Sequence, residues 1–384
     1  MIPFDFQPRT RIVFGPDSLQ QLGPLARELG ASTALVVSDP GVIHAGHTQK
    51  GLDCLEEAGV QAVLFDGVQE NPSTVNVAAG VAFAKEHKPD LIVGLGGGSA
   101  MDCAKGINFL LTNGGEMKDY WGVGKATQEM LPMIAVPTTA GTGSEAQSFA
   151  LITDAETHVK MACGDKKAAC RIALLDPQLT ITQPRTVTAL TGIDAISHAL
   201  ETFVTKKRNE VSLAFSREAW RLLAANYTKV LAEPENLEAR GAMQLGACFA
   251  GMAIENSMLG AAHALANPLT AHYGIVHGQA VAVMLPSVIR YNGEAFNVMY
   301  RDLLSVPVDV PGYPSIEQGA YGLADLVQSW VDQAGLATNL GQLSINGEKL
   351  AAMSTDAAKQ WTGHFNPREV DAGEFSKLYQ AAMH

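Results

Sequence analysis

Short apolar runs alternate with helical stretches throughout the first half of the chain, and this alternation limits the folds that are open to it. The runs are rich in β-branched residues and read TALVVSD at 33–39, QAVLFDG at 61–67, DLIVGLGGG at 90–98 and PMIAVPTT at 132–139. Continuous runs of this kind are typical of strands buried on both faces. Between them, residues 46–59 and 74–89 have helical periodicity and end at Gly or Pro. The pattern predicts a mostly parallel sheet covered by helices.

The sequence changes in character near residue 184. The second half consists of long Ala- and Leu-rich segments that lack strand signals, interrupted by a proline-rich loop at 305–315. The whole chain has 384 residues, more than the roughly 250–300 that a single hydrophobic core supports. We therefore expect two domains, an α/β domain over residues 1–183 and an all-helical domain over residues 184–384.

Charge and cysteine content exclude several classes of partner. The formal net charge of −12 argues against nucleic acid or an anionic membrane, because both attract basic surfaces. The N-terminus has no basic segment followed by an apolar stretch, so we expect no signal peptide, and no apolar run approaches the ~18–20 residues of a membrane span. The 5 cysteines form no CxxC pair, which argues against a disulfide framework or a thiolate zinc site. These features predict a cytoplasmic protein.

A glycine-rich segment follows the third apolar run and leads into a predicted helix. Gly96, Gly97 and Gly98 let the backbone approach a pyrophosphate, and Ser99 adds a hydroxyl donor. The N-terminus of the helix supplies unpaired N–H groups and a partial positive charge. The segment matches neither of the standard nucleotide fingerprints. A tight turn between strand and helix, with no ligand, is the alternative interpretation.

A second polar loop follows the fourth apolar run. Its hydroxyl residues are Thr138, Thr139, Thr142 and Ser144, beside two glycines. Hydroxyls and bare backbone suit the oxygens of ribose and phosphate better than they suit a core. Because ligands of such sheets bind at the carboxyl ends of the strands, two loops of this kind favour a dinucleotide.

Asp39 ends the first apolar run and bears on the choice of dinucleotide. A carboxylate in this position accepts hydrogen bonds from a ribose and repels a 2′-phosphate, which favours NAD, with NADP as the alternative. A turn-forming Asp before Pro40 is the competing interpretation.

Asp194 and His198 stand four residues apart in an otherwise apolar helical run, GIDAISHALE, and therefore project from one helical face. A single pair at this spacing is commonly an ion pair on the side of a helix. The later segment 260–278 adds His263 and His277 in an equally apolar setting. Burying four such groups without a cation costs several kcal/mol each or shifts their protonation. One carboxylate and three imidazoles form a ligand set suited to Fe²⁺ or Zn²⁺, with Ni²⁺, Co²⁺ or Mn²⁺ as alternatives.

Taken together, these segments resemble the iron-containing (group III) alcohol dehydrogenases. The motifs are GLGGGSAMDCAKG, VPTTAGTGSEA, ALLDPQLT, GIDAISHALE and GAAHALANPL with HGQAVAVMLPSVIRYN; RIVFGPDSL and FNPREV are weaker landmarks. The resemblance covers almost the whole chain. It implies an N-terminal Rossmann-like domain and a helical C-terminal domain, in the fold also found in dehydroquinate synthase. It also implies a cleft between the domains that holds NAD(P) and a divalent metal.

The resemblance also assigns roles to individual residues. It places the metal on Asp194, His198, His263 and His277, the four residues already selected by their chemistry. The remaining assignments concern the cofactor: Gly96, Gly97, Gly98 and Ser99 at the pyrophosphate, Asp102 near the nicotinamide side, Thr138, Thr139 and Ser144 at adenine, ribose or nicotinamide, and Lys160 near the nicotinamide ribose. A homodimer or larger homo-oligomer is implied as well.

The chain departs from the family at one position of consequence. Many members carry a second histidine, often proposed as a proton relay, where this chain has Asn267. An asparagine forms hydrogen bonds but carries no proton at neutral pH. His272 is a candidate for the relay in its place. The alternative, which is the more common case, is that His272 is an ordinary surface or interface histidine.

The sequence thus predicts a metal-dependent, NAD(P)-linked dehydrogenase of a small alcohol or diol, which also reduces an aldehyde or ketone. A cation would polarise the substrate oxygen while a hydride passes to or from nicotinamide. Alternatives with the same fold are a hydroxyacid–oxoacid transhydrogenase and a glycerol dehydrogenase-like enzyme. A non-catalytic scaffold that binds nucleotide or metal is the alternative from another class.

Overall fold

A computed structural model describes residues 3–384, and the chain divides into two compact units. One unit is Gln7–Gln183, and the other is Pro184–His384 together with residues 3–6. Among residues 3–384, no helix combines the length and the apolar character of a transmembrane span.

The first unit is built on a six-stranded parallel sheet in the order β1-β9-β6-β4-β2-β3. Its strands are β1 (Arg11–Phe14), β2 (Thr33–Val37), β3 (Gln61–Phe65), β4 (Leu91–Gly96), β6 (Met133–Pro137) and β9 (Ile172–Leu175). Every strand pair in this sheet is parallel, so all the carboxyl ends lie at one edge. The predicted parallel sheet is confirmed, and β1 and β9 extend it beyond the four runs that the sequence indicated.

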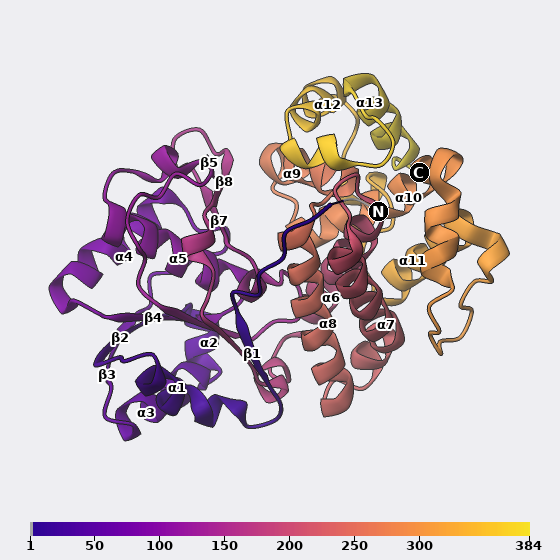
Figure 1. Cartoon of the computed structure of the whole chain (residues 1–384). Helices are drawn as coiled ribbons and strands as arrows, with labels where there is room; N and C mark the ends of the chain where they lie inside the picture. Colours follow the sequence, from indigo (N-terminus) through magenta and orange to yellow (C-terminus); the bar gives the residue numbers. More distant parts are fainter. Residues whose placement is uncertain (1–2) are drawn as a thin grey trace. The chain divides into compact units, whose positions relative to one another are not determined.

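Helices cover both faces of this sheet (Figure 1). They are α1 (Leu22–Glu28), α2 (Pro40–His44), α3 (His47–Glu57), α4 (Thr74–His87) and α5 (Gly98–Asn113). Alternate side chains of β2 enter opposite cores: Leu35 and Val37 pack in the core that contains residues of α4 and α5, whereas Val36 packs with residues of α1 and α3. Two buried faces explain why β2 and β4 read as continuous apolar runs.

Burial on both faces holds only in part for the run at 61–67. Val63 packs against one core and Ala62 and Leu64 pack against the other, but all three are only partly buried. The strand β3 within it has only one buried residue, Phe65, because it lies at the edge of the sheet and pairs with β2 alone. A small second sheet, absent from the sequence-based expectations, has the order β5-β8-β7. It consists of β5 (Gly122–Val123), β7 (Phe149–Thr153) and β8 (Lys160–Gly164).

The second unit is helical, as expected, and contains no strand within its described residues. Its helices are α6 (Arg185–Val204), α7 (Glu210–Ala232), α8 (Leu237–Asn256), α9 (Ala261–Tyr273), α10 (His277–Leu304), α11 (Gly319–Gln333), α12 (Leu350–Ala358) and α13 (Ala372–Ala381). Figure 1 shows α6, α7 and α8 running alongside one another. The proline-rich segment 305–315 has no helix or strand, as predicted.

Short 3₁₀ helices complete both units. They are η1 (Ser18–Gln21), η2 (Met117–Tyr120), η3 (Ser144–Ala146), η4 (Lys166–Ala168), η5 (Pro177–Thr180), η6 (Ile316–Gln318), η7 (Gly341–Leu343) and η8 (Trp361–Phe365). Of these, η3 contains Ser144, a residue of the candidate cofactor site.

Candidate active site

The helix α6 presents Asp194 and His198 on one buried face. Their neighbours Ile193 and Ile196 are fully buried and anchor the helix in the core. Asp194 and His198 are almost fully buried too, and Nε2 of His198 lies 3.5 Å from Oδ1 of Asp194. A spacing of four residues places them one above the other on the helix, as the sequence predicted.

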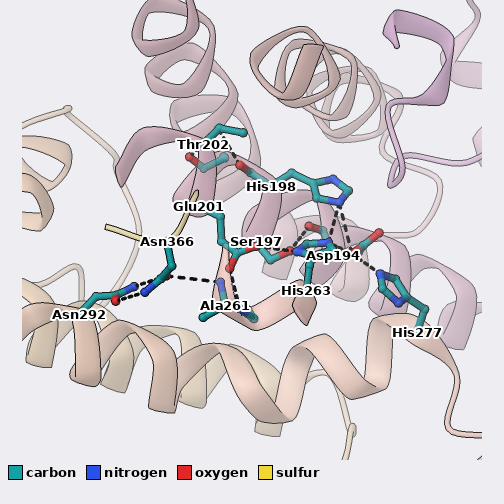
Figure 2. Close-up of polar contacts among 12 residues, drawn as sticks. Asp194, Ser197, His198, Glu201, Thr202, Ala261, His263, His277, Asn292 and Asn366 are labelled. Atoms are coloured by element: carbon teal, nitrogen blue, oxygen red, sulfur yellow. Dashed lines mark hydrogen bonds and ion pairs between the residues drawn. The ribbon is translucent and has the colours of Figure 1, made fainter. Parts of the chain in front are cut away.

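Two other helices bring His263 and His277 to the same carboxylate. His263 is in the first turn of α9, and its Nε2 lies 3.5 Å from Oδ1 of Asp194. His277 begins α10, and its Nε2 lies 3.8 Å from the same oxygen. The Nε2 atoms of His198 and His263 are 3.1 Å apart. Figure 2 shows the three rings turned toward Asp194.

The cluster fits a divalent cation. Oδ1 of Asp194 is buried, and among the described residues it has no hydrogen-bond partner. Two ligands held at 2.0–2.1 Å by one tetrahedral Zn²⁺ lie roughly 3.3 Å apart, which is close to the separations found here. Asp194, His263 and His277 each offer one ligand atom within a mutual 4.8 Å, and His198 lies within 3.5 Å of Asp194. A carboxylate with imidazoles suits Fe²⁺ or Zn²⁺.

The electrostatics of the cluster favour positive charge at its centre. Burial by itself would raise the pKa of Asp194, but the neighbouring His198, His263 and His277 outweigh burial and hold that pKa below its usual range. Burial would likewise lower the pKa of His263, but Glu201 and Asp194 raise it to about 9. Either a proton or a metal cation between these groups supplies the positive charge that the two carboxylates favour.

Sequence reasoning missed Glu201. It lies on the same face of α6 as Asp194 and His198, and its Oε2 is 2.6 Å from Nδ1 of His263. Such a carboxylate behind a ligating histidine is a common feature of metal sites. The signal was available, because three polar residues at positions i, i+4 and i+7 of an apolar helix share one face.

Asn267 and His272 are both engaged with the C-terminal part of the chain. Nδ2 of Asn267 donates to Oε1 of Gln360 at 2.9 Å. Nε2 of His272 lies 2.8 Å from Oδ2 of Asp356 on α12. His272 therefore forms an ordinary ion-pair contact between helices, which is the alternative that the sequence left open for it.

In the other unit, the two predicted loops pack against each other at the carboxyl ends of β4 and β6. The N–H of Thr138 donates to the carbonyl of Gly96 at 3.0 Å. A Cβ on Gly97 would lie 3.3 Å from Thr139, and one on Gly98 would lie 2.6 Å from Thr142. The 16-residue helix α5 begins at Gly98. The glycines thus give the backbone room and expose the first N–H groups of a long helix.

Ser99 and Asp39 flank the glycine loop. Oγ of Ser99 accepts a hydrogen bond from the N–H of Asn71 at 3.3 Å. Oδ1 of Asp39 caps α2 by accepting from the N–H groups of Gly41 and Val42. Its Oδ2 lies 3.1 Å from the point where a Cβ of Gly96 would stand. Asp39 is therefore a turn-forming residue and also places a carboxylate oxygen beside the loop, so the two interpretations are compatible.

Ser144, Asp102 and a residue that the sequence did not single out, Lys105, form one network. Oγ of Ser144 donates to Oδ1 of Asp102 at 2.8 Å. Nζ of the fully buried Lys105 donates to the carbonyl of Ser144 at 2.6 Å, to its Oγ at 2.9 Å and to the carbonyl of Phe149 at 3.0 Å. Burial raises the pKa of Asp102, against the opposing effects of Lys105, Ser144 and Lys160. Lys160, the first residue of β8, is thus electrostatically coupled to this network.

Comparison with known proteins gives matches over nearly the whole chain. The family described as "Iron-containing alcohol dehydrogenase" matches residues 8–177, and "Fe-containing alcohol dehydrogenase family, C-terminal" matches residues 188–383. The 1,3-propanediol dehydrogenase of Klebsiella pneumoniae is 34% identical over 383 residues, 99% of each chain.

Two solved structures extend the comparison. A 1,3-propanediol oxidoreductase has a TM-score of 0.95 at 34% identity and is covered over 100% of both chains. The sulfoacetaldehyde reductase of Bifidobacterium kashiwanohense, solved in complex with NAD⁺, has a TM-score of 0.89 at 26% identity, with 100% and 99% of the chains covered.

Proposed function

Because this chain belongs to the iron-containing alcohol dehydrogenase family, we propose that it oxidises a small alcohol or diol with NAD⁺ and reduces the corresponding aldehyde or ketone in reverse. The proposal rests on one observation: three imidazole Nε2 atoms converge on Oδ1 of Asp194, a buried carboxylate oxygen that has no hydrogen-bond partner among the described residues. Burying these polar groups costs desolvation free energy, which apolar side chains in the same places would avoid.

We assign Asp194, His198, His263 and His277 as the ligands of one Fe²⁺ or Zn²⁺. A divalent cation in this position supplies Lewis-acid chemistry, which polarises a substrate oxygen. The chain contributes a ligand set from three helices, buried except for the partly exposed His277, so little reorganisation is needed on binding. The substrate class is small alcohols and aldehydes, as for the relatives named above.

We assign the cofactor to the glycine loop and its neighbours in the first unit. Gly96, Gly97, Gly98 and Ser99 would hold the pyrophosphate at the N-terminus of α5. Thr138, Thr139, Ser144, Asp102 and Lys160 would contact the remainder of the dinucleotide. The nicotinamide supplies the hydride chemistry. In support, a structural relative was solved in complex with NAD⁺.

The charge of Asp39 is the basis for choosing NAD over NADP. Its Oδ2 stands beside Gly96, where a 2′-phosphate would meet like charge. The matched variant is Asp39→Asn, because asparagine keeps the helix cap and removes only the charge. We expect kcat/KM with NADP⁺ to rise relative to that with NAD⁺, and an unchanged ratio would refute the role of Asp39.

The proton of the alcohol does not pass through position 267 in this proposal. The amide of Asn267 does not titrate, and its Nδ2 is occupied by Gln360. His272 is held by Asp356. Neither Asn267 nor His272 therefore acts as the proton relay in this proposal.

Substitution of His263 tests the proposed function. In His263→Ala we expect loss of bound metal and a fall in hydride transfer of at least about a thousandfold, since Lewis-acid stabilisation is worth several kcal/mol. The matched control is His272→Ala, which removes a histidine of the same helix that contacts Asp356 instead. The control should keep both its metal and its activity. Full activity in a metal-free His263→Ala variant would end the proposal.

The remaining parts of the proposal concern domains, assembly and location. We propose a nucleotide-binding domain over residues 1–183 and a domain for metal and substrate over residues 184–384, in a cytoplasmic homo-oligomer. The two family matches, over 8–177 and 188–383, support this division. Within residues 3–384, none of the 5 cysteines forms a disulfide, which suits a reducing compartment. Light scattering after size-exclusion chromatography measures the assembly directly, and a monomer would contradict it.

A further inference from the structure

The carboxylate of Glu201 joins two helices beside the proposed metal ligands. Glu201 is buried on α6, close to the C-terminal end of that helix, and both of its oxygens face the first turn of α9 (Figure 2). Oε1 accepts a hydrogen bond from the N–H of Ala262 at 2.7 Å. Oε2 lies 2.6 Å from Nδ1 of His263. One carboxylate therefore binds both the backbone and the side chain of consecutive residues.

The first turn of α9 needs acceptors from elsewhere in the chain. The residue before it, Gly260, has no side chain to cap the helix. The first N–H groups of a helix have no partner within it, so they must find acceptors outside. Oε1 of Glu201 accepts a hydrogen bond from the N–H of Ala262, and Oδ1 of Asn366 accepts one from the N–H of Ala261 at 3.3 Å.

Gly260 makes room for these two acceptors. A Cβ there would lie 3.0 Å from Oε1 of Glu201 and 3.1 Å from Oδ1 of Asn366. Both distances are shorter than ordinary van der Waals contact. Any other residue would push the acceptors away from the helix.

The amide of Asn366, in the FNPREV motif, is held in one orientation. Its Nδ2 donates to Oδ1 of Asn292 at 2.8 Å and to the carbonyl of Arg368 at 2.7 Å. Its Oδ1 accepts in turn from Nδ2 of Asn292 at 3.0 Å. Because Nδ2 and Oδ1 both have hydrogen-bond partners, the amide cannot flip, and Oδ1 stays on the side of Ala261. The motif thus completes the cap that Glu201 begins.

We propose that Glu201 is a positioning residue for the metal site, which fixes both the tautomer and the place of His263. The inference rests on the proposed function. When Oε2 accepts from Nδ1–H, the neutral ring keeps its lone pair on Nε2, directed at Oδ1 of Asp194. When Oε1 holds Ala262, the backbone that carries the ring cannot move away.

Only a carboxylate satisfies both donors at once. Ala262 and His263 each present an N–H to Glu201, and an ionised carboxylate accepts at both oxygens. A glutamine in the same place accepts at one oxygen only, and its NH₂ group then faces the other donor. If the NH₂ group faces His263, the ring must shift its proton to Nε2, where it blocks metal binding. If the NH₂ group faces Ala262, two donors meet.

The first test measures Zn²⁺ affinity of the full-length protein by competition with a chromophoric chelator. In Glu201→Gln we expect affinity to fall by roughly 10–100-fold, as for other carboxylates behind ligating histidines. The matched control is Thr202→Val, an equally isosteric change at the next buried position of α6. Its hydroxyl bonds the backbone oxygen of His198 and the hydroxyl of Ser216 and touches no ligand side chain. The control should retain the parent affinity.

The second test reads the tautomer of His263 directly by ¹⁵N NMR in the Zn²⁺-loaded parent. We expect the proton on Nδ1 and metal-shifted Nε2, a signature that general loss of packing would not produce. A proton on Nε2 would overturn the inference, even if Glu201→Gln did not fold. If the parent bound no Zn²⁺, the proposed function itself would fail. If the parent bound Zn²⁺ and folded Glu201→Gln bound it equally well, only the role of Glu201 would fail.

Discussion

Gly278 follows the proposed ligand His277 directly, and its replacement by alanine should disturb the metal site through the backbone. Gly278 is buried in the first turn of α10, which packs against α6. A Cβ added there would lie 2.5 Å from the carbonyl oxygen of Leu190 and 2.9 Å from its carbonyl carbon. Leu190 is one turn before Asp194 on α6, so the clash falls between the helices that carry His277 and Asp194.

The size of the effect follows from these distances. Ordinary van der Waals contact begins at 3.4 Å, so the two helices must separate locally by about 0.9 Å, because backbone atoms cannot rotate aside. Overpacking of this kind costs about 1–3 kcal/mol, and alanine returns at most about 1 kcal/mol through its helix propensity. We expect the free energy of unfolding to fall by about 1–2 kcal/mol. The 3.8 Å separation of His277 from Asp194 should lengthen, and Zn²⁺ affinity should drop roughly tenfold or more.

Urea unfolding and chelator competition measure the two quantities in Gly278→Ala. The matched control is Gly246→Ala on α8, whose added Cβ would meet only side-chain atoms, the nearest being Leu223 Cγ at 2.8 Å. The control should lose some stability but keep its affinity for Zn²⁺. The reasoning is refuted if Gly278→Ala unfolds at the parent's urea concentration and binds Zn²⁺ as tightly as the parent.

Three further predictions concern other parts of the molecule. Lys105→Met removes the donor of two buried hydrogen bonds to Ser144 and of a partly buried one to Phe149, so the free energy of unfolding should fall by about 2 kcal/mol or more and NADH should bind more weakly by fluorescence titration; no change in either would contradict the proposed network. Exposure separates the thiols, because Cys103, Cys163, Cys170 and Cys248 are buried whereas Cys54 is half-buried, and burial raises the pKa of Cys54 as well as that of Cys103. Ellman's reagent should therefore modify only Cys54 in the native protein and all 5 thiols after denaturation. Although burial opposes it, the contacts of Asp356 with His272 and Lys359 lower its pKa below 3.8, so its stabilising effect is complete above that value and is lost as the pH falls through the lowered pKa. Because the pair is partly exposed, Asp356→Asn should cost a few tenths of a kcal/mol at pH 7 and progressively less as the pH falls below 3.8, and a cost that does not change with pH would contradict this assignment.

The sequence by itself determined the features that depend on local spacing. Continuous apolar runs and glycine-rich turns identified the central strands and the loop that opens α5, because these patterns follow from the geometry of buried strands and helix starts. The spacing of Asp194 and His198 placed both on one face of a helix before any partner was known. The chemistry of two further imidazoles in an apolar segment then selected His263 and His277, and the family motifs agreed.

The tertiary structure decided everything that depends on residues far apart in the chain. Helical spacing could place Glu201 on the face of Asp194 and His198, but it could not identify its partner. Glu201 contacts His263 across 62 positions and Lys105 contacts Ser144 across 39, and no local pattern predicts such pairs. The sequence left His272 as a candidate relay, and only the packing of α9 against α12 showed its contact with Asp356. The edge position of β3 was equally invisible, because an apolar run does not record how many neighbours its strand will have. Local pattern fixes which face of an element a side chain occupies, whereas its partner is set by how the elements pack.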